Sequence, residues 1–154
     1  MAARATDRPR IRVAALMVLD GQVVVVRHRA GAAVYHLLPG GGVSWGETLE
    51  DALLREIAEE TGLSAQIGRL LFVSDTIDPS ERRHVVNITF EATVTGGQIT
   101  SAPADARVEA VDLVRPEDLA ALDLRPPMAE ALARALAGQI AESPYLGSLF
   151  TAGA

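Results

Sequence analysis

The alternation of hydrophobic and polar positions predicts a chain that begins with β-strands. Residues 11–19 and 22–29 are two runs rich in β-branched side chains, and the Asp20-Gly21 pair between them is a turn signal typical of a β-hairpin. The unbroken valines at 23–26 predict a strand that is buried on both faces. We therefore expect a buried hairpin at the start of the fold.

A helix is predicted from about Thr48 to Thr61. Thr48, with Asp51 three residues later, matches an N-terminal capping box, because a threonine side chain can accept a hydrogen bond from a free backbone N–H of the first turn. Gly62 supplies the C-terminal stop signal. Both ends of this helix are therefore marked in the sequence.

The same helix carries Glu56, Glu59 and Glu60 on its apolar side. At about 100° per residue these acids continue the stripe that Leu49 and Leu53 begin, whereas a solvated face would place its charges opposite the leucines. Carboxylates near a helix C-terminus also oppose the helix macrodipole unless a cation compensates them. Two interpretations follow: surface acids in a good helix-forming sequence, or clustered oxygen ligands for Mg²⁺ or Mn²⁺.

Further strands are predicted in the second half of the chain. Strand-like segments cover residues 65–77, 83–94 and 106–114, with polar loops between them. Gly96-Gly97 has the composition of a turn and predicts one more short strand after it. Together with the first strands, these segments predict a mixed β-sheet.

Two helices are expected towards the C-terminus, a short one at residues 116–122 and a longer one at 126–143, with Pro126 and Pro127 in the first turn of the longer helix. The order of strands and helices predicts one α/β domain. The expected divisions are a flexible N-terminus at residues 1–10, the domain at 11–142, and a tail at 143–154 that packs on the domain or on a partner.

Composition narrows the possible partners and chemistry. The chain has 154 residues, 49% of them hydrophobic, and a formal net charge of -6, which argues against binding to nucleic acid or to an anionic membrane. No run of about 18 apolar residues exists, so we expect no membrane span. The absence of cysteine excludes disulfides and thiol catalysis, and it agrees with a cytoplasmic location. The absence of lysine excludes Schiff-base chemistry.

The stretch from Gly41 to Leu63 has a specific spacing of residues. It consists of Gly41, five residues, Glu47, seven residues, Arg55-Glu56-Ile57, one residue, Glu59-Glu60, one residue and Gly62-Leu63. This string fills every fixed position of the Nudix hydrolase signature, a coincidence expected by chance roughly once in a million. The chain therefore resembles the Nudix hydrolases.

The resemblance implies an α/β/α sandwich with a mixed sheet, in which the signature forms a loop, a helix and a loop. It also implies that the glutamates bind Mg²⁺, with Mn²⁺ as the alternative, and that Gly41 contributes its carbonyl. By the same resemblance, Glu47 and Arg55 form a salt bridge that holds the loop. The catalytic residues expected are Glu47, Arg55, Glu56, Glu59 and Glu60, with the base being Glu56 or Glu59.

Residues outside the signature are further candidates. Glu109, with Asp105 as the alternate, is a candidate for an extra metal ligand, although a plain surface acid is as good an interpretation. Candidate contacts to the substrate are Arg27 and Arg29 at a strand end, Tyr35 before the signature, Trp45 inside it, and Arg83 after a loop. For Arg27 and Arg29 the alternative is a solvated strand end, and for Trp45 it is simple packing.

The function that the resemblance implies is a metal-dependent pyrophosphohydrolase. Its substrate would be a nucleoside diphosphate linked to a group X, such as ADP-ribose, and it would release a nucleoside monophosphate. The alternatives are a housecleaning pyrophosphatase of (deoxy)nucleoside triphosphates and a nucleotide-binding module without catalysis. We expect a small-molecule nucleotide as the partner, a homodimer as one possible assembly, and a place in the cytoplasm.

Overall fold

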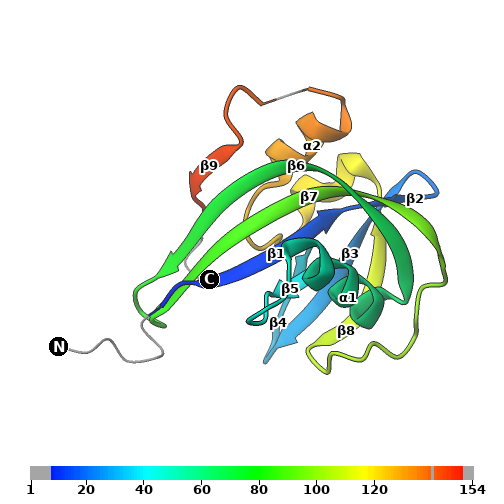
Figure 1. Cartoon of the computed structure of the whole chain (residues 1–154), viewed down its shortest axis with the longest axis horizontal. Coiled ribbons are helices and arrows are strands. Elements are labelled where there is room, and N and C mark those ends of the chain that lie inside the picture. Colours follow the sequence, from blue (N-terminus) through cyan, green and yellow to red (C-terminus); the bar gives the residue numbers. More distant parts are fainter. Residues whose placement is uncertain (1–7, 140, 151–154) are drawn as a thin grey trace.

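The computed structural model describes residues 8–139 and 141–150. Its strands and helices follow the order shown in Figure 1. In chain order they are β1 (Arg10–Leu16), β2 (Val18–Leu19), β3 (Gln22–Ala30), β4 (Ala33–Leu37), β5 (Gly40–Gly42), α1 (Leu49–Thr61), β6 (Leu63–Asp78), β7 (Arg83–Gly97), β8 (Val108–Val114), the 3₁₀ helix η1 (Pro116–Ala121), α2 (Ala129–Leu136) and β9 (Tyr145–Ser148).

The strands form two sheets. The first is a five-stranded mixed sheet in the order β5-β1-β7-β6-β9, in which β1 runs parallel to β7 and β6 runs parallel to β9. The second is antiparallel and contains β2, β3 and β4, with β8 also paired to β3. The expected mixed sheet is therefore present, and an antiparallel sheet accompanies it.

The predicted hairpin is only partly correct. β2 and β3 pair across the Asp20-Gly21 turn, as expected, with Val18 opposite Val23. The prediction is wrong for β1, which pairs with β5 and β7 in the other sheet. The chain changes sheets at the fully buried Met17, so β1 and β3 are central strands of different sheets. This arrangement buries both strands more completely than an isolated hairpin would.

Helices lie on both sides of β1. Ala15 belongs to a core cluster that includes Leu53 of α1, whereas its neighbour Ala14 belongs to a second cluster that includes Leu132 of α2. Successive residues of a strand point to opposite faces, so α1 and α2 cover opposite sides. The α/β/α sandwich is therefore confirmed. Figure 1 shows α1 in front of the strands and α2 at the top of the view, beyond β6.

The four valines of β3 have no exposed surface. Val23 and Val25 face the α2 cluster, and Val24 faces the α1 cluster, so this strand is buried on both faces as predicted. Full burial of a valine contributes about 1.5–3 kcal/mol of hydrophobic free energy. β3 is thus a rigid support for the residues that follow it.

The signature helix has the predicted ends. The side chain of Thr48 accepts a hydrogen bond from the Asp51 backbone N–H at 3.0 Å. At the other end Gly62 adopts φ +77°, and its N–H donates to the Ala58 carbonyl at 3.0 Å. A residue with a Cβ is strained in this left-handed conformation, which explains a glycine at the C-cap.

The expected strand after Gly96-Gly97 is absent, because residues 98–107 form a loop that caps α1 instead. The N–H of Thr100 donates to the Thr61 carbonyl, and that of Ala104 donates to the Glu59 carbonyl, both at 2.9 Å. These bonds satisfy carbonyls that a helix end leaves free. The loop is therefore tied to the acidic end of the signature helix.

The last helix is shorter than predicted. Pro126 and Pro127 precede α2, which begins at Ala129 and ends two residues before Gly138. A residue followed by proline disfavours the helical conformation, so Pro126 cannot lie in a first turn before Pro127.

No helix in the described residues is long and apolar enough to cross a membrane.

Candidate active site

Helix α1 presents its glutamates with unequal exposure. Glu60 is 2% exposed and Glu56 is 8% exposed, so both continue the apolar stripe into the interior. The side chain of Glu59 lies at the margin of the stripe and is 45% exposed. Two buried carboxylates therefore lie one helical turn apart.

Glu60 is the most strongly perturbed of the three. Its Oε1 atom accepts a hydrogen bond from the Gly40 backbone N–H at 2.7 Å. Burial, with smaller contributions from the charges of Glu56 and Asp105, raises the pKa of Glu60 to about 7, against the Gly40 bond and the charge of Arg12. The ionised form of Glu60 is thus under-compensated, which is the condition that a bound cation relieves.

Gly41 lies directly against Glu56. A Cβ atom at position 41 would overlap the Glu56 carboxylate, so any larger residue would displace it. The Glu56 Oε1 atom also accepts a bond from Arg55 Nη1 at 2.9 Å. The glycine of the signature therefore leaves the Glu56 carboxylate in its place against the backbone.

Arg55 joins the signature loop to the helix. Its Nε and Nη2 atoms donate to the two carboxylate oxygens of Glu47 at 2.7 and 2.9 Å, and Nη2 also donates to the Gly42 carbonyl at 3.3 Å. The Ser44 N–H donates to Glu47 at 2.9 Å. The Arg55 bonds, with the Ser44 bond, lower the pKa of Glu47 to about 2. A two-point guanidinium contact fixes both partners in orientation.

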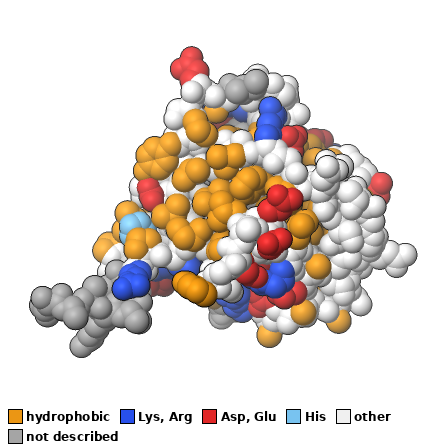
Figure 2. Space-filling view, in the orientation of Figure 1, with side chains coloured by type: hydrophobic (Ala, Val, Ile, Leu, Met, Phe, Trp, Pro, Cys, Tyr) orange, Lys and Arg blue, Asp and Glu red, His pale blue; other side chains and the backbone are white. Residues whose placement is uncertain are grey.

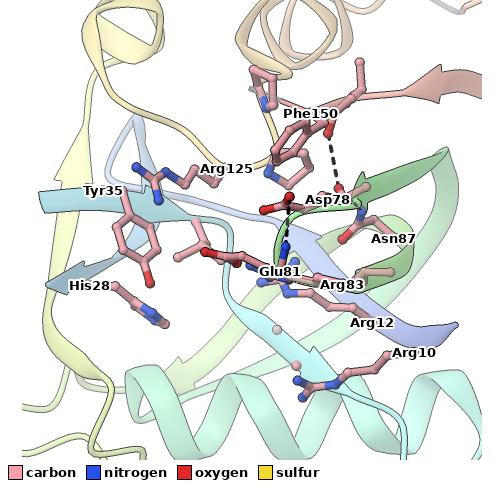
Figure 3. A pocket seen from close by; sticks show the side chains of 18 of the residues that line it. Arg10, Arg12, His28, Tyr35, Asp78, Glu81, Arg83, Asn87, Arg125 and Phe150 are labelled. Atoms are coloured by element: carbon pink, nitrogen blue, oxygen red, sulfur yellow. Dashed lines mark hydrogen bonds between the residues drawn. The ribbon is translucent and has the colours of Figure 1, made fainter. Parts of the chain in front are cut away.

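A cavity of about 360 Å³ lies beside α1 (Figure 3). Its charged and aromatic lining residues are Arg10, Arg12, Arg83, Arg107, Arg125, Glu60, Asp78, Glu81, His28, Tyr35 and Phe150. Arginines thus outnumber carboxylates in the lining, although the chain as a whole has a net charge of -6. The cavity is a local cationic region on an acidic protein.

Three of these arginines are close enough to influence one another. Burial lowers the pKa of Arg12, and the positive charges of Arg10 and Arg83 lower it further, against attraction from Glu60 and Glu56. Arg12 donates to the Leu38 carbonyl at 2.8 Å. Among the described residues, neither Arg10 nor Arg83 has a carboxylate within ion-pair distance. An anion in the cavity would relieve this repulsion.

The opposite part of the lining is aromatic. The Arg125 guanidinium lies 4.2 Å from the centre of the Tyr35 ring, and the His28 ring centre is 5.4 Å from that of Tyr35. Burial lowers the pKa of His28, which keeps its imidazole neutral. Within the described part of the chain, His28 Nε2 is buried without a hydrogen-bond partner.

Comparison with known proteins identifies the family. The family model of the NUDIX domain matches residues 8–135. The chain belongs to the NUDIX family. It is 34% identical over 106 residues to a protein named ADP-ribose pyrophosphatase from Methanocaldococcus jannaschii, a match that covers 68% of the chain and 63% of the relative. The chain thus spans less than two thirds of the length of the curated relatives it matches.

Solved NUDIX structures have the same fold. A MutT NUDIX hydrolase from Burkholderia pseudomallei is 36% identical, with a TM-score of 0.63, over 73% of this chain and 87% of that one. A NUDIX hydrolase from Nitrosomonas europaea superimposes with a TM-score of 0.75 at 23% identity, over 86% of this chain and 92% of that one. These similarities confirm the fold class expected from the signature.

NUDIX hydrolases generally use divalent metal ions, and the donor atoms of this chain fit such an ion. Glu56 and Glu60 offer hard carboxylate oxygens, the ligands that such ions prefer, and their mutual repulsion favours a cation. Within the described residues, no three acidic or imidazole side chains converge on one point. Arg55 engages Glu56 and Glu59 while Gly40 engages Glu60, so ligation would require these side chains to turn.

The substrate contacts expected from the NUDIX resemblance fall in different places. Tyr35 and Arg83 line the cavity. Arg27 and Arg29 do not, because they pair with Glu109 at 3.4 and 2.8 Å on the surface of β3 and β8. Trp45 is fully exposed in the signature loop and is not part of the lining.

The two candidates for an extra metal ligand, Glu109 and Asp105, also lie in different places. Glu109 is held by Arg29, and the structure does not bring it to the glutamates of α1. Asp105 lies in the loop that caps α1, and its charge raises the pKa of Glu60. Arg107 holds Asp105 with bonds of 2.7 and 3.1 Å. Asp105 is therefore the acid outside the signature whose charge reaches the NUDIX helix.

Several lining residues were not found from the sequence. They are Arg10, Arg12, Arg107, Arg125, His28 and Phe150. For Arg12 the sequence does contain a signal that could have been used. A charged residue within an apolar strand is rarely buried unless it has a partner or a function there. The others carry no local pattern, because strand pairing and loop packing bring them to the cavity.

Proposed function

We propose that the chain is a pyrophosphohydrolase that requires a divalent metal ion and cleaves a nucleoside diphosphate linked to a group X. The preferred ion is Mg²⁺, with Mn²⁺ as a substitute, and the product is a nucleoside monophosphate. ADP-ribose or a related nucleotide is the substrate that we favour. Membership of the NUDIX family and the name of the archaeal relative support this choice.

One observation supports the proposal more than any other. Arg10, Arg12 and Arg83 face the same cavity as Glu60, and two of these arginines have no carboxylate partner among the described residues. Guanidinium groups bind phosphate oxygens with directed, charge-assisted hydrogen bonds. Figure 3 shows Arg10 and Arg12 on the side of the cavity near α1, so a bound diphosphate would lie next to the glutamates.

Each part of the signature has a role in this proposal. Glu56, Glu59 and Glu60 hold the metal ion, together with the carbonyl of Gly41. A bound ion would neutralise the diphosphate oxygens and activate a water molecule for attack on phosphorus. Arg55 orients the ligands by holding the signature loop through its bonds to Glu47, a supporting role of the kind that typically tunes metal sites.

Two carboxylates are candidates for the base that takes the proton of the attacking water. Glu56 is buried and bonded to Arg55, whereas Glu59 is exposed and only 3.5 Å from the same guanidinium. A base must reach the water and release its proton afterwards, so both positions remain candidates. The pH dependence of kcat in Glu56→Gln and Glu59→Gln, measured at saturating metal ion, would distinguish them, because loss of the base changes the acidic limb whereas loss of a ligand alone lowers the affinity for the metal ion.

The size of the cavity agrees with a nucleotide. Pockets for small molecules typically enclose about 300–1,000 Å³, and the 360 Å³ measured here lies in that range. (Deoxy)nucleoside triphosphates also present a diphosphate beside a metal ion, so they belong in any substrate survey. The survey then separates the two substrate classes.

The test is hydrolysis by the purified 154-residue chain with Mg²⁺ or Mn²⁺. The panel contains ADP-ribose, nucleotide sugars, dinucleotides and (deoxy)nucleoside triphosphates, and the measured quantity is the nucleoside monophosphate released. We expect turnover of ADP-ribose or of a close analogue, and loss of that turnover in EDTA. No turnover of any compound with either metal would support the binding-module alternative instead.

Matched variants make this test specific. Glu60→Gln should lower kcat at least about a hundredfold, because it removes a ligand charge while keeping the shape of the side chain. Glu130→Gln is the control, since Glu130 is an exposed acid on α2 whose partner among the described residues is Arg134. Equal activities of the two variants would contradict the proposed site.

A homodimer and a cytoplasmic location stay predictions for this chain. Figure 2 shows hydrophobic side chains gathered above α1, over the sheet that contains β6. Leu70 and Tyr145 are 47% and 55% exposed. Sedimentation velocity of the unaltered chain and of Leu70→Glu would measure whether this face joins two copies.

A further inference from the structure

We propose that the segment directly after the C-terminal strand β9, Leu149 and Phe150, completes the substrate cavity and that the ring of Phe150 is the contact for the nucleobase. This inference rests on the proposed function, because it assigns one part of the nucleotide to one wall of the same cavity. Phe150 is thereby a specificity-determining residue that the signature does not contain. The contacts of β9, the composition of the wall and the layout of the cavity support it in turn.

The β9 segment is firmly attached to the sheet. The Pro144 carbonyl accepts a bond from the Val73 N–H at 2.9 Å, and the Leu149 N–H donates to the Asp75 carbonyl at 2.7 Å. The Thr76 hydroxyl donates to the Leu149 carbonyl at 3.2 Å. Backbone bonds before and after the strand therefore fix the position of residue 150.

The segment also reaches the cavity from outside the region that the family shares. The family match ends at residue 135, whereas Leu149 and Phe150 line the cavity. Leu149 packs against the α2 core cluster, so it anchors the wall from behind. Phe150 remains 41% exposed, and a large apolar ring at a cavity wall has surface available for a ligand.

The layout of the cavity decides which part of a nucleotide this ring would contact. Figure 3 shows Phe150 and Tyr35 away from α1, with Arg10 and Arg12 nearer to the helix. The arginines fit the diphosphate, which leaves the distal wall for an end of the substrate. The lining of the cavity also includes the rings of Pro126 and Pro127. Flat apolar surfaces stack on bases, whereas a sugar needs hydrogen-bond partners for its hydroxyls.

The test compares two ligands that differ only in the base. AMP and ribose 5-phosphate are titrated calorimetrically, with Mg²⁺ present, into the unaltered chain and into Phe150→Ala. We expect the substitution to weaken AMP about tenfold and to change ribose 5-phosphate less than twofold, since base stacking on an aromatic ring is worth about that factor. Equal effects on both ligands would overturn the proposal.

Two further variants separate the ring from the strand. Phe150→Tyr keeps an aromatic ring and should retain the affinity for AMP. Tyr145→Ala removes an aromatic ring of β9 itself, which lies outside the cavity and bonds to Asp75, so it tests whether loosening the strand is sufficient. We expect it to leave AMP binding within twofold. A tenfold loss in Tyr145→Ala, or no preference for AMP over ribose 5-phosphate in the unaltered chain, would overturn the assignment.

The binding test is independent of turnover. A chain that prefers AMP through Phe150 but hydrolyses nothing in the panel would retain the base contact and lose the proposed catalysis. A chain that hydrolyses ADP-ribose with the same KM in Phe150→Ala would retain the catalysis and lose the base contact. The two proposals can therefore fail separately.

Discussion

Glu60 is a carboxyl group that the fold buries beside another carboxyl group. Its pKa is about 7 in the folded chain, against an ordinary value of 4.5, chiefly because burial penalises the charge. The neighbouring Gly40 N–H compensates this penalty only in part. The free energy of unfolding of the chain should therefore depend on pH through this one residue.

We predict that the metal-free chain loses stability as the pH rises from about 4.5 to beyond 7. Below pH 4.5, Glu60 is protonated in both states and costs nothing; above it, the unfolded chain releases the proton first, so ionisation favours unfolding. The loss is on the order of 3 kcal/mol. Urea unfolding in EDTA at pH 5 and pH 8 measures it.

Glu60→Gln is the reference for this measurement, because it keeps an acceptor for the Gly40 N–H and removes the titration. We expect the two proteins to differ little at pH 5, and the variant to be the more stable at pH 8. Parallel pH profiles of the two proteins would show that the carboxyl group is not buried in solution as it is here.

We predict that Gly41→Ala lowers activity at least about tenfold, because the new methyl group would displace the Glu56 carboxylate. Gly96→Ala is the matched control, since a Cβ atom at that position has open space around it. Initial rates at saturating substrate measure both variants. A Gly41→Ala protein with unaltered activity would show that Glu56 need not hold this position.

At the scale of elements, the ends of α1 are set by residues next to the helix. Thr48 is its N-cap and Gly62 its C-cap, so the effects of these two residues do not depend on distant parts of the chain. The cap bond to Asp51 is a single neutral hydrogen bond at an exposed helix end. Its contribution can therefore be measured without disturbing the cavity.

We predict that Thr48→Ala costs about 1 kcal/mol of unfolding free energy, since it leaves a first-turn N–H without its side-chain acceptor. Thr48→Ser retains the hydroxyl and should lose only a small part of this. Urea denaturation of the three proteins provides the comparison. Equal stabilities of the alanine and serine variants would mean that solvent replaces the cap at no cost.

The same local character explains what the sequence could predict. The ends of α1 and the run of valines in β3 are marked by residues close together in the chain, whereas the pairing of Glu47 with Arg55 was expected from the resemblance to the Nudix signature. The arginine cavity depends on β1 lying parallel to β7, which places Arg12 opposite Asn87 in the sheet. No local pattern encodes such a pairing. The pairings of Arg29 and Glu109 across β3 and β8 escaped prediction for the same reason.

At the scale of the whole molecule, charge is unevenly distributed. An acidic chain encloses an arginine-lined cavity on one side of α1 and leaves the buried carboxylate of Glu60 under-compensated beside it. A bound cation would relieve the repulsion between the glutamates, and a bound anion would relieve the repulsion among the arginines. Each ligand should therefore stabilise the folded chain, and the two effects should add.

We predict that Mg²⁺ raises the melting temperature of the unaltered chain at pH 8. Binding to the folded state alone contributes about 2.7 kcal/mol at a hundred times Kd. The shift should be lost in a Glu56→Gln, Glu60→Gln double variant and retained in Glu130→Gln. A shift of equal size in the double variant would place the bound ion elsewhere on the surface.

The position of β9 has a consequence for how new substrate ranges could arise. The glutamates that would hold the metal ion lie in one continuous signature, whereas Leu149 and Phe150 reach the cavity from beyond β9. Changes in length or composition after residue 143 can therefore reshape one wall while every glutamate stays in place. A mutant library confined to residues 144–150 would explore selectivity without sampling the many variants that destroy the reaction.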